Sequence, residues 1–160
     1  GDGEDPSPGV AEAVRLLAAP AFDLVVEFES LLDALLPAPR GTAAATTAPP
    51  DRRELVRALR KRLAAHSRVF PVTGPAHRMA RAHESLPGSP GRAAELFRKA
   101  AAEADGQGRR LMGGVARLHL GWALPPAHEE RRPALEEARR RFAEVGAGVH
   151  ERRATAELDR

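Results

Sequence analysis

The feature that most constrains the fold is a series of apolar patterns with helical spacing, each bounded by proline or glycine. After Thr73 these patterns fill about 73–85, 91–105, 107–124, 127–145 and 147–159, and another precedes them at about 51–66. Proline is common at helix ends because it has no amide hydrogen to donate within a helix. Glycine is common there because it readily adopts the left-handed conformation that ends many helices. No segment alternates apolar and polar residues between hairpin signals. The sequence therefore predicts an all-α protein.

Residues 10–37 predict a helical hairpin, and its second helix, about 21–36, lies in the most apolar run of the chain. Its apolar residues are placed near one helix face or widen that face: Phe22, Val25, Val26, Phe28, Leu31, Leu32, Leu35 and Leu36. Four acids in residues 20–37 argue against a membrane span. Residues 1–9 are expected to be a disordered leader without a signal peptide. Residues 38–50, rich in proline, threonine and alanine, are expected to be a flexible linker before helical repeats at 51–160.

Composition narrows the range of partners. The chain of 160 residues has no cysteine, so it carries no disulfide and no thiolate metal site, and a reducing cytoplasm is expected. Its net charge is only +3, and acids and bases are interleaved. A nucleic-acid reader usually shows a one-sided basic face with aromatic residues, so nucleic acid is not the expected partner. A basic strip on the helix at 51–66 is either a phosphate-binding strip or a solvated face: Arg53, Arg57, Arg60 and Lys61.

The residues that carry chemistry in enzymes do not form a recognisable motif. No two of the six histidines combine with a carboxylate at ligand spacing, and there is no serine elbow or phosphate loop. Glu136 and Glu137 precede Arg140 and Arg141 by four residues, which favours ion pairs on a solvated helix face. The pair Gly113-Gly114 lies inside an apolar pattern and indicates close helix packing. The sequence therefore predicts no catalytic residue, no metal site and no cofactor.

An internal repeat runs through the second half of the chain. A shift of about 41 residues places Ala93 on Ala134 and Arg98-Lys99 on Arg139-Arg140, and a shift of about 40 places Gly108 on Gly148. A period of this length is typical of stacked helix pairs. In such a stack we expect the aromatic ring of Phe97 to fill the space between neighbouring helices.

The residues of this repeat resemble the tetratricopeptide repeat (TPR). The pair Leu120-Gly121 is followed by Leu124, and the neighbouring helix carries Ala93, Phe97 and Ala100 at the family's spacing. The resemblance implies antiparallel helix pairs stacked as a short TPR-like α-solenoid. The amino-acid sequence of residues 68–146 also resembles the helical-repeat tail of large actinobacterial signalling proteins. Those proteins join an ATP-binding module to a nucleotide cyclase, a kinase or a LuxR-type DNA-binding domain.

Stacked helix pairs offer a concave face to extended peptides and partner helices. The residues expected to line this face are mostly basic: His77, Arg78, Arg81, Arg117, His119, Arg152 and Arg153. They favour an acidic or helical peptide, although plain solvation of these side chains stays an equal alternative. The expected function is a non-enzymatic protein–protein interaction module of a bacterial regulatory protein.

Other interpretations stay open. The chain is alternatively a C-terminal fragment of an ATP-dependent nucleotide cyclase or transcriptional regulator, with catalysis elsewhere in the parent protein. A small nucleic-acid-binding helical protein and a small-molecule sensor near Trp122 are further alternatives. Homo-oligomerisation is also left open.

Overall fold

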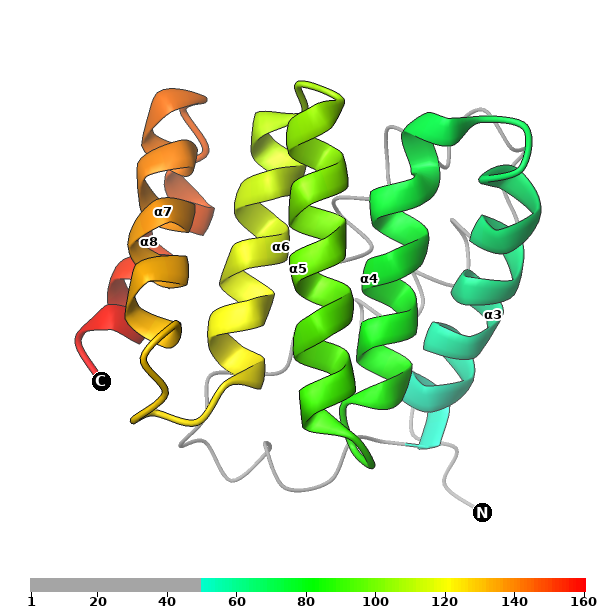
Figure 1. Cartoon of the computed structure of the whole chain (residues 1–160), viewed down its shortest axis with the longest axis horizontal. Helices are drawn as coiled ribbons and strands as arrows, with labels where there is room; N and C mark the ends of the chain where they lie inside the picture. Colours follow the sequence, from blue (N-terminus) through cyan, green and yellow to red (C-terminus); the bar gives the residue numbers. More distant parts are fainter. Residues whose placement is uncertain (1–49) are drawn as a thin grey trace, which may run out of the picture.

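The computed structural model describes residues 50–160, apart from the side chains of residues 50–55, 62 and 66. These residues form six α-helices and one short 3-10 helix (Figure 1). They are α3 (Pro50–His66), η2 (Pro71–Thr73), α4 (Gly74–Ser85), α5 (Pro90–Gly106), α6 (Arg110–Ala123), α7 (Arg131–Glu144) and α8 (Gly148–Leu158). No strand occurs among them, which confirms the all-α prediction for this part of the chain. The predicted leader 1–9, the hairpin 10–37 and the linker up to residue 49 lie outside the described residues.

The helices pack in the order in which the chain visits them. Successive helices are in contact from α3 through to α8, and α4 makes a smaller contact with α6. Figure 1 shows the helices side by side in a row, with neighbours in the chain running in opposite directions. Within residues 50–160 no helix combines the length and the apolar character that crossing a membrane requires. The described part is thus a row of antiparallel helices built largely from contacts between sequence neighbours.

The ring of Phe97 lies where the sequence predicts it, between neighbouring helices. Its side chain is fully buried on α5. The ring centroid lies 5.2 Å from that of His83 on α4 and 5.6 Å from that of His119 on α6. Phe97 therefore joins three successive helices, and truncating such a ring to alanine typically costs about 3–5 kcal/mol.

Two glycines of α6 allow α7 to approach closely. A Cβ atom on Gly114 would lie 2.9 Å from Cε1 of Phe142, and one on Gly121 would lie 2.5 Å from Cδ2 of Leu135. Phe142 and Leu135 are fully buried. The prediction that the glycines of this helix serve close packing is confirmed, whereas the buried ring of Phe142 was missed in the sequence.

Two further glycines end α5 and α7 in the left-handed conformation. Gly108 has φ 68° and Gly146 has φ 71°. The residue after each glycine donates a backbone hydrogen bond to the carbonyl oxygen five residues earlier. The amide of Arg109 donates to Ala104, and the amide of Ala147 donates to Phe142, each at 2.8 Å. The equivalent glycines are therefore Gly108 and Gly146, not Gly108 and Gly148. The spacing differs from the expected one because α7 has 14 residues and α5 has 17.

Candidate partner-binding surface

Three of the seven residues predicted to bind a partner lie together on α4. His77, Arg78 and Arg81 are all half-buried. Nε of Arg78 donates a hydrogen bond of 2.5 Å to Oε2 of Glu103 on α5. Within the described residues Arg81 makes no ion pair. An acidic partner would therefore compete with Glu103 for Arg78 but would find Arg81 available.

Helix α3 adds two arginines to this part of the surface. Nε of Arg60 lies 2.9 Å from Oε2 of Glu84 on α4, and Nε of Arg57 lies 3.8 Å from Oε1 of the same carboxylate. One carboxylate thus faces two guanidinium groups. The two helices together carry more positive than negative charge, and we refer to Arg57, Arg60, His77, Arg78 and Arg81 as the α3–α4 basic surface.

The charges of this surface affect the pKa of His77. Burial lowers the pKa of the His77 imidazole, and the positive charges of Arg81, Arg60 and Arg78 lower it further, while Glu103 opposes them. A cationic imidazole is disfavoured beside three guanidinium groups. The same positive potential would favour a carboxylate from a partner.

The side chain of Arg117 on α6 forms hydrogen bonds with other groups of the chain at the place where α5, α6 and α7 meet. Its Nη2 donates to Oδ2 of Asp105 on α5 at 2.6 Å, and its Nη1 donates to the carbonyl oxygen of Gly113 at 3.0 Å. Arg141 on α7 donates to the same carboxylate. A Cβ atom on Gly113 would lie 2.6 Å from Oδ1 of Asp105, so the glycine leaves room for this cluster. Arg117 therefore links α6 to α5 and, through the shared carboxylate of Asp105, to α7.

Further ion pairs extend this cluster along α7. Oε1 of Glu137 accepts hydrogen bonds from Arg141 and Arg140, each at 2.7 Å. Arg140 also bonds Glu144 at 2.5 Å, and Arg110 of α6 reaches Glu144 at 3.3 Å. The pair Glu137 and Arg141 has the four-residue spacing that the sequence indicates, but it lies partly buried and linked to Asp105. The expected pair Glu136 and Arg140 is replaced by Arg132 bonding Glu136 at 2.9 Å.

His119 is buried, with 1% of its surface exposed. Its Nδ1 lies 2.6 Å from Nε2 of His83 on α4, within hydrogen-bond distance. Its ring centroid lies 5.0 Å from that of Trp122. Among the residues predicted for the partner-binding face, His119 thus packs inside the row, where it connects α4 with α6.

The last two predicted residues lie far along the row. Arg152 is exposed and Arg153 is partly buried, and both are on α8. Helices α5, α6 and α7 separate them from α4 (Figure 1). The structure therefore brings together three of the seven predicted residues, those on α4.

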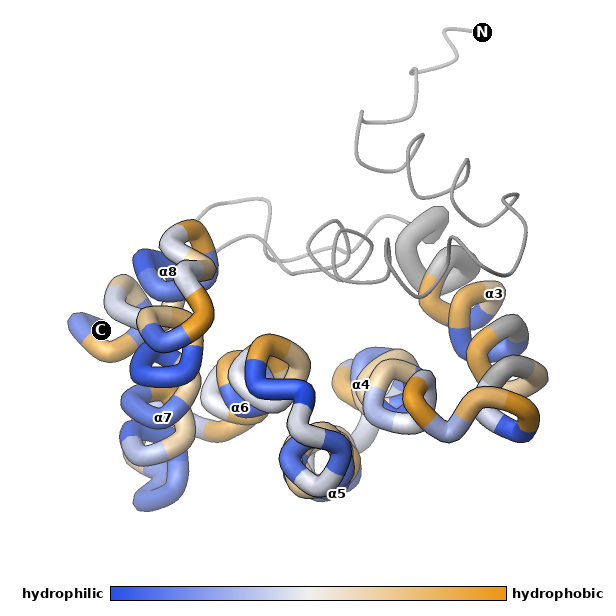
Figure 2. The backbone as a smooth tube through the Cα atoms, turned by 90° about the horizontal axis from the view of Figure 1, so that it is seen from above, coloured by the Kyte–Doolittle hydropathy of each residue, from blue (hydrophilic) through white to orange (hydrophobic). Residues whose placement is uncertain are grey.

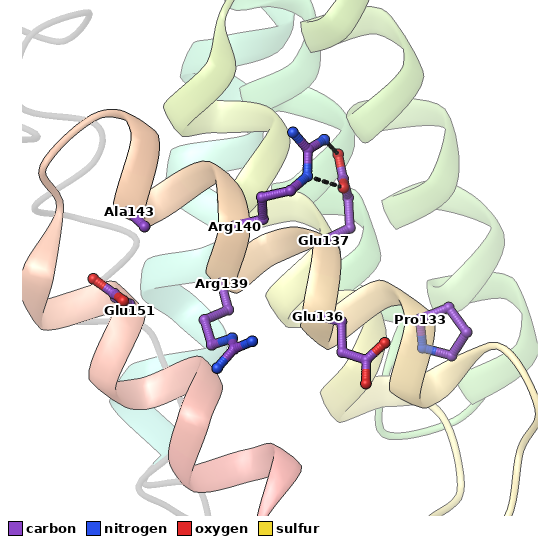
Figure 3. A pocket seen from close by; sticks show the side chains of 7 residues that line it. All are labelled: Pro133, Glu136, Glu137, Arg139, Arg140, Ala143 and Glu151. Atoms are coloured by element: carbon purple, nitrogen blue, oxygen red, sulfur yellow. Dashed lines mark hydrogen bonds and ion pairs between the residues drawn. The ribbon is translucent and has the colours of Figure 1, made fainter.

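A groove of about 600 Å³ lies on the outer side of α7, next to α8, and was not foreseen from the sequence (Figure 3). It is lined mostly by charged side chains: Pro133, Glu136, Glu137, Arg139, Arg140, Ala143 and Glu151. In Figure 3 Arg139 of α7 and Glu151 of α8 both project toward the space between the two helices. The sequence shows only a charged, exposed face on α7. Many solvated helices have such a face, so it does not predict a groove.

In the described part of the chain, histidines and carboxylates form no group of three or more that could hold a metal ion. Comparisons of the chain with protein-family models, curated proteins and solved structures find no match.

Proposed function

We propose that this chain is a non-enzymatic helical-repeat module that binds a partner protein. The observation that carries the proposal is the order of packing, in which successive described helices pack on one another from α3 to α8. Arrays of this kind present long surfaces built from successive helices, and partners bind there as peptides or helices. The buried ring of Phe97 and the glycine contacts of α6 support a TPR-like stack of helix pairs.

Within this proposal the α3–α4 basic surface binds an acidic segment of the partner. Arg57 and Arg60 both lie near the carboxylate of Glu84, which supports a carboxylate as the partner group. Arg81 lies one helical turn from His77 and makes no ion pair with described residues. A partner carboxylate would meet Arg81 in the positive potential that, after burial, contributes to the lowered pKa of His77.

The setting of the module is part of the same proposal. The resemblance of residues 68–146 to signalling-protein tails favours a bacterial regulatory protein acting in the cytoplasm. In such a protein the module would hold a partner or another domain in place, and any catalysis would belong to a different polypeptide segment. The partner class is therefore another regulatory protein with an acidic segment.

The test measures binding of a fluorescently labelled oligoglutamate peptide to the full chain by anisotropy. Arg81→Glu should weaken binding about tenfold, equivalent to about 1.4 kcal/mol, because it reverses the charge of an arginine that makes no ion pair with described residues. Arg92→Glu is the matched control, because Arg92 is exposed on α5 and the substitution changes the net charge equally. Equal losses in both variants, or tighter binding of duplex DNA than of the peptide, would contradict the proposed partner class.

A further inference from the structure

The outer side of α7 forms the groove described above and is open to solvent. In the described structure α7 packs on α6 and α8, and it is hydrophilic along most of its length (Figure 2). Five of the residues that line the groove belong to this helix and are exposed: Pro133, Glu136, Arg139, Arg140 and Ala143. Ala138, in the middle of the same helix, is fully buried. Two residues along a helix correspond to a rotation of about 200°, so Glu136 and Arg140 lie on the side opposite Ala138.

The residues of this face are arranged symmetrically about the level of Ala138. Glu136 precedes Ala138 by two residues, and Arg140 follows it by two. Pro133 precedes it by five residues, and Ala143 follows it by five. An acid on one half of the face is thus matched by a base on the other half, and a compact apolar residue by another. A helix face with this pattern is complementary to a copy of itself that runs in the opposite direction.

We propose that two copies of the chain associate through this groove, with their α7 helices antiparallel about a two-fold axis. In a contact with two-fold symmetry each residue pair occurs twice. Glu136 of one copy would lie level with Arg140 of the second copy, and Pro133 of one copy level with Ala143 of the second. Helices that cross at about 20° stay in contact over several turns, which is the length of this face.

The charges of the groove favour a second copy over a partner that is only acidic or only basic. Among the described residues Arg139 makes no ion pair, and neither does Glu151 of α8. Both side chains project toward the space between α7 and α8 (Figure 3). The groove thus offers a cation and an anion that are not used within the described part of the chain. A partner with one sign of charge would match only one of them, whereas a second copy carries both.

The strength of the contact follows from its composition. Glu136 already accepts a hydrogen bond from Arg132, and Arg140 donates to Glu137 and Glu144. Exposed ion pairs contribute little each, so the charges select the partner and its direction more than they add affinity. Two exposed valines at the connection of α7 to α8 add apolar surface beyond Ala143: Val145 and Val149. We therefore expect a dimer that dissociates on dilution.

The experiment measures the mass of the full chain in solution by sedimentation velocity over a range of concentrations. The wild type should rise from the mass of one chain toward that of two. Glu136→Arg places two arginines level with each other twice in the dimer, and Arg140→Glu does the same with two glutamates. Each variant alone should therefore dimerise at least tenfold more weakly than the wild type. An equimolar mixture of the two variants restores both opposite-charge pairs and should dimerise like the wild type.

Two substitutions on α5 are the matched controls, because they change the net charge by the same amounts at exposed positions: Glu95→Arg and Arg92→Glu. They should leave dimerisation unchanged, and circular dichroism should show that all variants keep their helices. A wild type that stays at the mass of one chain would overturn the proposal, as would a mixture that fails to recover or controls that weaken dimerisation equally. The groove lies at the end of the row away from α3 (Figure 1), so this outcome is independent of acidic-peptide binding.

Discussion

At the residue scale, the close approach of α6 and α7 depends on the absence of two side chains. Glycine in a helix interior costs about 1 kcal/mol relative to alanine, so its presence needs a compensating reason. Here the reason is steric, because Gly121 lies beneath the branched end of Leu135 and Gly114 lies beneath the ring of Phe142. The glycines thus lower the intrinsic stability of α6, but they allow its surface to contact the buried surface of α7.

We predict that Gly121→Ala destabilises the protein despite the higher helix propensity of alanine. Its Cβ atom would lie 2.5 Å from Cδ2 and 2.6 Å from Cγ of Leu135, so the leucine would have to move. Overpacking of this kind costs about 1–3 kcal/mol, which outweighs the gain in propensity. Urea denaturation should show a lower midpoint than in the wild type.

Gly91→Ala is the matched control for this substitution. Gly91 lies in α5, and a Cβ atom on it would meet no other side chain or neighbouring helix within 4 Å. The control should keep or slightly raise the urea midpoint. If both variants raised the midpoint, Gly121 would not be a packing contact.

The burial of individual residues could be predicted only where the sequence shows which neighbour they meet. Phe97 stands alone among alanines, so a buried ring was expected and is found. Phe142 stands among arginines and glutamates, and its burial depends on Gly114 of another helix. His119 has leucines on both sides in the sequence, but its burial follows from contacts with α4 and α5. Contacts between distant residues leave no periodic signal that a single sequence can reveal.

At the element scale, the carboxylate of Asp105 links α5 to both α6 and α7. It accepts hydrogen bonds from Arg117 and Arg141, whose side chains are 19% and 16% exposed. Burial opposes the charged carboxylate, but the two arginines outweigh this effect and hold the pKa of Asp105 below its ordinary value. The ionised form is therefore the one that stabilises the contact of the three helices.

We predict that acid weakens this contact and that Asp105→Asn removes part of the acid sensitivity. Because the pKa of Asp105 is lower in the folded state, its contribution is present above the unfolded value of about 3.9. It is lost as the pH falls through the folded value. At neutral pH the variant should lose about 1–2 kcal/mol, since two partly buried arginines lose their counter-charge.

The measurement is chemical denaturation of wild type and variant between pH 7 and pH 3. The difference between their free energies of unfolding should shrink toward the acid end. Glu95→Gln is a suitable control, because the pair Glu95 and Lys99 is exposed on α5. A difference that stays constant with pH would show that Asp105 does not act through its charge.

Helix bounds were predictable to within a few residues, while the details of their ends were not. Proline and glycine mark the sequence positions where α4, α5 and α8 begin. The helix expected at 127–145 begins only at Arg131, because the preceding residues form turns in which the amide of Arg131 donates to His128 and that of His128 to Pro125. These turns take the place of the first helical turn that the sequence predicts.

At the scale of the whole molecule, the described part extends by addition of one helix after another. Such a molecule gains most of its stability from contacts between neighbouring elements, so its parts need not open together. Helix α6 lies between α5 and α7 and is buried almost all round, whereas α8 packs mainly on α7. The repeat in the sequence predicts stacked helix pairs, but a repeat signal does not reveal how strongly such units are coupled.

We predict that amide hydrogen exchange will be slowest in α6 and clearly faster in α8. Only Ala154 and Glu157 are buried in α8, so opening it exposes little apolar surface, whereas opening α6 breaks contacts to both of its neighbours. Local openings of this kind range in free energy from near zero up to the global value. Exchange followed by mass spectrometry on the intact chain should therefore show protection that rises from α8 to α6. Arg131→Ala, which removes the bond from Nη2 to Glu157 of α8, should speed exchange in α8 and leave α5 unchanged. Equal protection of α6 and α8 would instead mean that the row unfolds as one cooperative unit.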